Sequence, residues 1–270
     1  MNALQETEFN LLKIFVEICN KNNIPYFMAC GSALGAVKYK GFIPWDDDID
    51  VCLMRKDYER FLECAPSYLP KWCFLQNYNT DPAFPHSYTK LRDSRTTFIE
   101  KGVAKLKINH GVFIDVFPID GYPEDESDIL KFEKQKKFIT RLIFCSLNDR
   151  SSFKIIVRNK IFRILGCKKR NAHYVKKLEN LFKKFPCEGS KILCNHGNWQ
   201  GKLEYAPAWH YGDGVFAVFE GLEVRIPENF DAYLTQKYGE WRKDPKESLQ
   251  KSNHSVMICD TQKPYFEYLS

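Results

Sequence analysis

Four aspartates fall within five consecutive positions of a segment that otherwise reads as a buried strand. They occupy positions 46–48 and 50, and Asp50 lies between two aliphatic residues. Side chains alternate between the two faces of a strand, so Asp48 and Asp50 are predicted to share one face. Unpaired buried carboxylates are costly, whereas a carboxylate pair suits a hard cation, Mg²⁺ first and Mn²⁺ as the alternative. A solvated turn explains Asp47 and leaves Asp46 open, but it does not explain Asp50.

A fifth carboxylate lies in a second apolar run. Asp115 sits inside a predicted strand over residues 112–117, where its neighbours are aliphatic or aromatic. The structural alternative is a core acid paired with Lys or Arg. On a strand beside Asp48 and Asp50, Asp115 completes a three-carboxylate site whose metal ion holds a diphosphate. It is also the candidate to accept a proton from an attacking hydroxyl, unless it serves as a ligand only.

A glycine-serine turn precedes the acids. Gly31 and Ser32 join a predicted strand over residues 26–30 to a short predicted helix over residues 33–40. Glycine lets a ligand approach the backbone closely, and a helix N-terminus favours phosphate. Such turns are common, so this feature gains weight only beside the acids.

Four basic side chains are candidate phosphate contacts. Lys90 and Arg92 share one face of a predicted strand over residues 86–92, and Arg95 follows it. Arginine offers a planar fork to phosphate and lysine a mobile charge. A charged, solvated edge strand is the alternative. His254 lies in a polar segment, where a plain surface histidine competes with a phosphate contact.

The pattern of elements predicts an α/β fold with a mixed α+β sheet. A helix over residues 3–22 is followed by strands that end with 112–117, which Pro118 is expected to close. Residues 127–185 read as helical, and a hairpin is predicted at residues 215–226. We therefore expect a catalytic core over residues 1–120 and a helical and mixed region over residues 121–270 that completes the substrate site.

Composition says more about the cellular compartment of the protein than about its reaction. The net charge of +6 is mild and fits an anionic substrate, although a solvated surface is the default. Ten cysteines without a C-x-x-C pair, no signal segment and no membrane-length apolar run predict a reduced, cytoplasmic protein. Nothing indicates a nucleic-acid partner. The basic, amphipathic residues 153–170 favour a packed helix, with contact at the inner face of a membrane as the alternative.

Several blocks of this chain together resemble the LicD family. They are residues 30–37, 40–51, 55–58, 90–93, 114–120 and 238–239. The resemblance implies a nucleotidyltransferase-like core. In that core Gly31 and Ser32 take the phosphate-binding turn, Asp48 and Asp50 take the metal, and Asp115 is the third acid. The gap between the turn and the acid pair is longer than in typical nucleotidyltransferases, as it is in LicD proteins.

The resemblance also implies a reaction. LicD-like proteins move an alcohol phosphate, phosphocholine or ribitol phosphate, from a CDP-activated donor to a sugar hydroxyl and release CMP. We therefore expect transfer to a glycan or lipid-linked glycan precursor of the cell surface. Nucleotidyl transfer to a small molecule is the enzymatic alternative, and a glycan- or nucleotide-binding module without turnover is the alternative of another class.

Overall fold

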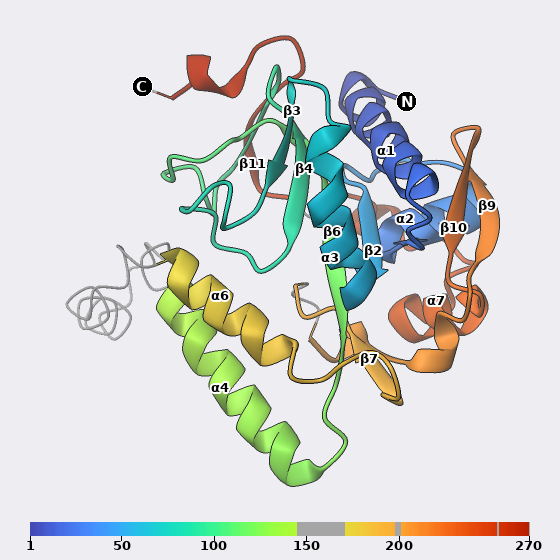
Figure 1. The fold of residues 1–270 in the computed structure, drawn as a ribbon. Coiled ribbons are helices and arrows are strands. Elements are labelled where there is room, and N and C mark those ends of the chain that lie inside the picture. The colour runs from blue at the N-terminus through green and yellow to red at the C-terminus, as the bar shows by residue number, and fades with distance from the viewer. Residues whose placement is uncertain (145–170, 198–200, 253, 270) are drawn as a thin grey trace.

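The computed structural model describes residues 1–144, 171–197, 201–252 and 254–269. Within these residues, seven strands form a mixed sheet of order β1-β2-β6-β4-β3, which β7 and β8 extend from β6 (Figure 1). The strands are β1 (Phe27–Met28), β2 (Asp50–Met54), β3 (Cys73–Gln76), β4 (Thr89–Asp93), β6 (Val112–Gly121), β7 (Ile192–Cys194) and β8 (Tyr205–Pro207). The predicted combination of helices with a mixed sheet is confirmed.

One parallel pair lies at the centre of this sheet. Strand β2 runs parallel to β6, and the remaining pairs are antiparallel. Two small sheets flank it: β9 (Val215–Phe219) pairs with β10 (Leu222–Ile226), and β5 (Thr97–Glu100) pairs with β11 (Val256–Asp260). The predicted hairpin is confirmed, and β11 carries the C-terminal segment back to the core.

Helices cover the sheet and position its edges. The described α-helices are α1 (Ala3–Lys21), α2 (Cys30–Leu34), α3 (Arg55–Cys64), α4 (Glu126–Phe144), α6 (Asn171–Phe182) and α7 (Phe230–Tyr238). Helix α1 begins at a capping box in which Asn2 and Gln5 exchange hydrogen bonds of 2.9 and 3.1 Å. Its apolar stripe, which includes Phe15, packs with Phe61 of α3 over the buried centre of the sheet.

Among the predicted strand boundaries that differ from the structure, two bear on the site. The acid-rich strand begins only at Asp50, because residues 46–48 form a loop that is held by contacts from outside the sheet. Strand β6 does not end at Pro118 but continues to Gly121. The Asp115 N–H points toward β2, so by alternation the ring of Pro118 faces the edge that β4 has already left. A proline is tolerated there because no ladder hydrogen bond is lost.

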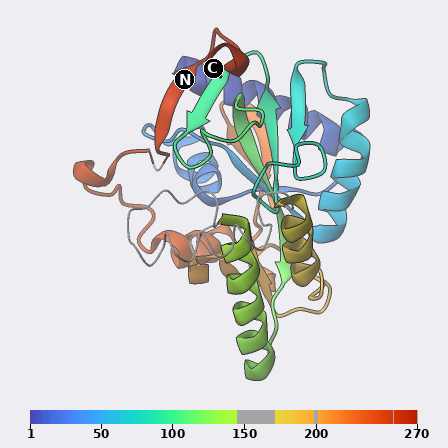
Figure 2. The ribbon, with the colours of Figure 1, turned by 90° about the vertical axis from the view of Figure 1, so that its left-hand side faces the viewer.

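Helices α4 and α6 form an antiparallel pair that projects from the sheet (Figures 1 and 2). Arg55 fixes α6 to the core through ion pairs with Asp120 at 2.6 Å and Glu179 at 2.9 Å. Strand β7, from the C-terminal half of the sequence, pairs with the end of β6. The amphipathic stretch at residues 153–170 lies outside the described residues.

Two further properties bear on the expectations from composition. The eight cysteines among the described residues are all free thiols. Within the same part of the chain, no helix combines the length and the apolar character that crossing a bilayer requires.

Candidate active site

The two carboxylates on neighbouring strands lie directly opposite each other. Asp50 at the start of β2 is in register with Asp115 of β6, and the Asp115 N–H donates to the Ile49 carbonyl at 2.8 Å. Both side chains are more than 90% buried, and both line one cavity of about 930 Å³. We call this the acidic cavity. The predicted adjacency of the two acid-bearing strands is therefore present in the fold.

The loop of residues 46–48, which we call the acid loop, brings two more carboxylates to the acidic cavity. Asp46 and Asp48 line the acidic cavity, although neither belongs to a strand. Burial, followed by the charge of Asp48, raises the pKa of Asp46 to about 8. Burial also raises the pKa of Asp50, with further contributions from Asp48 and Asp115. In the protein alone, burial and mutual repulsion therefore favour the protonated forms of these carboxyl groups.

The glycine-serine turn contacts the acid loop and the start of β2. Ser32 is buried, and its Oγ accepts the backbone N–H of Asp50 at 2.8 Å. Its hydroxyl therefore fixes the start of β2 and does not line the cavity. Gly31 does line it, and a Cβ atom at this position would lie 2.7 Å from Asp46 Oδ2. The close approach of the loop explains why a glycine stands here.

Lys90 is the buried cation among the acids. Its Nζ lies 3.1 Å from Asp115 Oδ1 and 3.7 Å from Glu100 Oε2. Glu100, at the end of β5, was not identified from the sequence. Burial raises its pKa, but the positive charges of Lys90 and its neighbours outweigh burial and hold the pKa near 2. Lys90 is thus already engaged by carboxylates and faces the cavity beside them.

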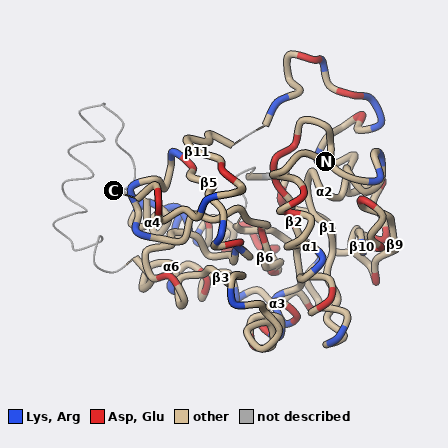
Figure 3. Tube along the Cα trace, turned by 90° about the horizontal axis from the view of Figure 1, so that it is seen from above, with Lys and Arg blue, Asp and Glu red and all other residues tan. Residues whose placement is uncertain are grey.

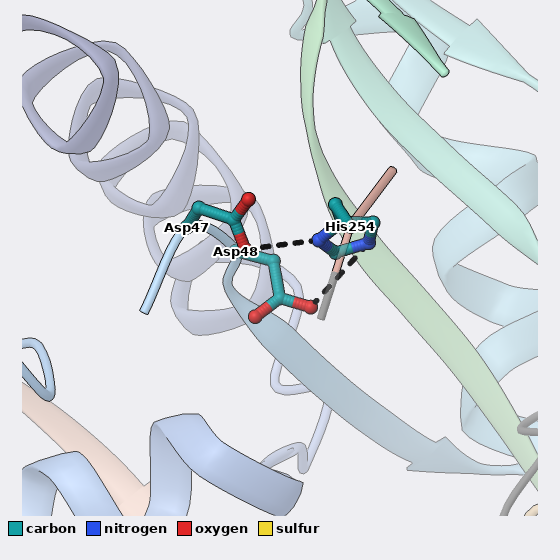
Figure 4. A group of neighbouring side chains, drawn as sticks. All are labelled: Asp47, Asp48 and His254. Carbon is teal, nitrogen blue, oxygen red and sulfur yellow. Dashed lines mark hydrogen bonds and ion pairs between the residues drawn. The ribbon is translucent and has the colours of Figure 1, made fainter. Parts of the chain in front are cut away.

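His254, in the C-terminal segment, contacts the acid loop. Figure 4 shows its ring beside Asp47 and Asp48; Nδ1 lies 3.0 Å from Asp47 Oδ1, and Nε2 lies 3.9 Å from Asp48 Oδ2. Burial lowers its pKa, but the hydrogen bond to Asp47 and the charge of Asp48 outweigh burial and raise it to about 9. Asp47 also accepts a hydrogen bond from Ser252. The solvated-turn interpretation of Asp47 therefore does not describe its surroundings.

The two predicted arginines lie apart from the acidic cavity. The guanidinium of Arg92 is buried and donates to the Gln76 side chain and the Gly111 carbonyl, both at 2.5 Å. Arg95 pairs with Asp93 at 2.7 Å and stacks on Trp72. Neither lines the cavity, so this placement gives their predicted phosphate contact no support.

The donor set fits a divalent cation. Asp48, Asp50 and Asp115 offer hard oxygen ligands in one cavity, and each has a raised pKa for which burial is the first cause. Over the described part of the chain, the group of three metal-ligating side chains whose ligand atoms all lie within 4.8 Å of one another is Asp47, Asp48 and His254; the set Asp48, Asp50 and Asp115 is not such a group. A protonated His254 cannot bind a metal ion, so this second group acts as an ion-pair cluster while that proton remains.

The outer wall of the cavity carries rings and cations. These residues are Lys38, Tyr39, Trp45, Trp241, Lys243 and Lys251. The rings of Tyr39 and Trp45 meet edge to face, with their centroids 6.2 Å apart. Lys38 Nζ lies 2.6 Å from Asp244 Oδ1. Glu8 of α1, a buried acid that does not line the cavity, was also missed; burial, followed by the charges of the nearby aspartates, raises its pKa.

The chain matches a family of known proteins. Residues 23–157, half of the chain, match the family model described as LicD/FKTN/FKRP, nucleotidyltransferase domain. Over 263 aligned positions the chain is 28% identical to the lipopolysaccharide cholinephosphotransferase LicD of Haemophilus influenzae, covering 91% of this chain and 92% of that protein. An uncharacterised protein of Rickettsia typhi is 40% identical over 60 residues, which cover 22% of this chain and 19% of that protein.

Proposed function

Because the chain belongs to the LicD/FKTN/FKRP family, we propose that it transfers an alcohol phosphate from a CDP-activated donor to a hydroxyl of a cell-surface glycan precursor. The named activity of the Haemophilus relative supports phosphocholine as the group transferred and a lipopolysaccharide-type glycan as the acceptor. The observation that carries the proposal is the register of Asp50 with Asp115 inside a large cavity. So many buried carboxylates can receive an anionic diphosphate only together with cations.

Asp48, Asp50 and Asp115 are the residues proposed to hold the cation, with Mg²⁺ as the first candidate and Mn²⁺ as the alternative. When bound, the ion supplies neutralisation of the phosphate oxygens and of the departing nucleotide. The contribution of the protein is a rigid set of oxygens. Asp50 is fixed through its own backbone by Ser32, and Asp115 by the parallel ladder to β2.

The proposed reaction is a displacement at one phosphorus atom. The acceptor oxygen forms a bond to the phosphorus that carries the alcohol, the bond from that phosphorus to the oxygen of CMP breaks, and the acceptor proton passes to a carboxylate. Asp115 is our candidate for that carboxylate, because burial raises its pKa and so makes it a stronger proton acceptor, while Lys90 at 3.1 Å favours its ionised form. Products are the phosphorylated glycan and CMP.

The outer wall of the cavity supports a nucleotide donor. The indole of Trp45 offers a stacking surface for a base, and Lys243 and Lys251 offer charge to phosphate. Gly31 lines the cavity at the beginning of α2. Phosphate contacts by Gly31, Lys90 and His254 remain part of the proposal.

The direct test is product analysis. The purified protein is incubated with Mg²⁺, labelled CDP-choline and a lipopolysaccharide acceptor, and CMP and phosphocholine-modified glycan are measured. We expect Asp50→Asn to lower turnover about a thousandfold, because it removes one ligand charge. Asp213→Asn, at an exposed position, is the matched control and should retain activity. Near-normal turnover of Asp50→Asn would contradict the proposed site.

Nucleotidyl transfer is the second candidate, because the matched family model is described as a nucleotidyltransferase domain. It predicts pyrophosphate release from CTP in the presence of an acceptor and no CMP from CDP-choline. Running both donors side by side separates the two reactions. Absence of both products, with nucleotide binding retained, would favour a binding module without turnover.

A further inference from the structure

Helix α4 exposes a face that its packing does not need. Its other side packs on α6, where Phe132, Ile139 and Ile143 join the apolar cluster of Val175 and Phe182. The exposed side combines apolar and basic residues at helical spacing. It consists of Leu130, Lys131, Lys134, Lys137, Phe138 and Arg141. We call this set the basic α4 face.

Both large apolar side chains on this face are strongly exposed. Leu130 is 66% and Phe138 is 54% exposed, and apolar side chains beside lysines on one helix face are typical of a helix that lies in a membrane interface. They lie eight residues apart, about two helical turns, so they occupy the same side of α4. Figures 1 and 2 show α4 projecting from the sheet.

The surrounding cations are largely uncompensated. Lys131 pairs with Asp128 at 3.2 Å. Among the described residues, no ion pair engages Lys134, Lys137 or Arg141. Figure 3 shows the Lys and Arg positions of α4 in blue. Within the described part of the chain, the basic α4 face therefore presents three positive charges without an ion-pair partner, and they flank two exposed apolar side chains.

We propose that the basic α4 face binds an anionic lipid bilayer surface. Lysine and arginine gain attraction from anionic headgroups, and Leu and Phe gain by entering the boundary between headgroups and acyl chains. Nucleic acid would satisfy the cations, but it would leave Leu130 exposed. This surface is independent of the acidic cavity, and it would hold the protein where lipid-linked acceptors lie.

The test measures binding of the full chain to vesicles. The protein is sedimented with vesicles of phosphatidylcholine alone and of equal parts phosphatidylcholine and phosphatidylglycerol, at low and at physiological salt. The variant Lys134→Gln/Lys137→Gln/Arg141→Gln should lose at least about tenfold in partitioning to the anionic vesicles. The part of the binding that persists at physiological salt should be lost in Leu130→Ser/Phe138→Ser.

The matched control removes the same charge elsewhere. Lys13→Gln/Lys56→Gln/Lys71→Gln changes three exposed lysines on α1, on α3 and before β3, and it should bind as the wild type does. Circular dichroism checks that each variant is folded. Equal loss in the control would reduce the effect to net charge and overturn the proposal, as would unchanged binding of the α4 variant. Tighter binding to duplex DNA that is lost in the same α4 variant would reassign the surface to nucleic acid.

Discussion

Removing the buried lysine of the acidic cavity should destabilise the protein unless a metal ion replaces its charge. In Lys90→Met most of the side-chain length is kept and the charge is lost. The change leaves Asp115 without the cation at 3.1 Å and Glu100 without the cation at 3.7 Å. The remaining carboxylates then repel one another inside a buried site.

The size of the effect follows from Glu100. Burial raises its pKa, but Lys90, Arg92 and His254 together hold it at about 2, against an ordinary value of 4.5. That difference corresponds to about 3 kcal/mol of native-state stabilisation, complete above pH 4.5 and lost as the pH falls toward 2. Because Lys90 is the largest of the lowering causes, we expect Lys90→Met to lower the free energy of unfolding by about 2–3 kcal/mol at pH 7.

Urea unfolding followed by circular dichroism measures this loss, first with EDTA and then with Mg²⁺. The matched control is Lys237→Met, which breaks another buried pair, Lys237 with Glu204 at 2.8 Å. Both variants should be destabilised in EDTA. Mg²⁺ should stabilise Lys90→Met more than the wild type, and Lys237→Met to the same extent as the wild type. A loss below about 1 kcal/mol in Lys90→Met, or an equal response to Mg²⁺ in all three proteins, would refute the reasoning.

Three further predictions follow from contacts of the core. Ser32→Ala leaves the buried Asp50 N–H without its acceptor, so urea unfolding should show a loss of about 1–3 kcal/mol, and an unchanged stability would contradict the contact. Gly31→Ala places a Cβ 2.7 Å from Asp46 Oδ2, which can move; turnover should fall while the unfolding free energy changes by less than about 1 kcal/mol. His196 stacks on Phe182, and burial lowers its pKa to about 3. As the pH falls, the imidazole therefore binds a proton in the unfolded protein at a higher pH than it does in the folded protein. Between pH 6.5 and 3 the wild type should lose stability relative to His196→Phe by about 1.4 kcal/mol per pH unit, and equal slopes would be evidence against a neutral buried imidazole.

The pairing of the two acid-bearing strands is the part of the site that the sequence could predict. Asp50 and Asp115 each interrupt an apolar run, and burial cannot be reconciled with an isolated carboxylate. Neighbouring positions in one sheet let the two carboxylates share a partner such as a cation. Their register, Asp50 opposite Asp115, depends on how β2 and β6 meet, which no local pattern contains.

Long-range partners explain what sequence patterns could not reach. Lys90 and Arg92 share a strand face as predicted, but Gln76 and Gly111 engage the guanidinium of Arg92 away from the cavity. Asp47 reads as a solvated turn because its partner, His254, is 207 residues away along the chain. Period-two alternation placed Asp48 correctly beside Asp50 in the cavity for a reason that proved wrong, since Asp48 lies in a loop.

The most direct test of the acidic cavity is the position of a bound ion. Crystals of the protein grown with Mn²⁺ and a CDP-alcohol would give an anomalous difference peak at the metal. We expect that peak in contact with carboxylate oxygens of Asp50 and Asp115, with Asp48 as the third ligand, and its loss in Asp50→Asn. A peak held by Asp47, Asp48 and His254 alone, or no peak with the donor bound, would contradict the account.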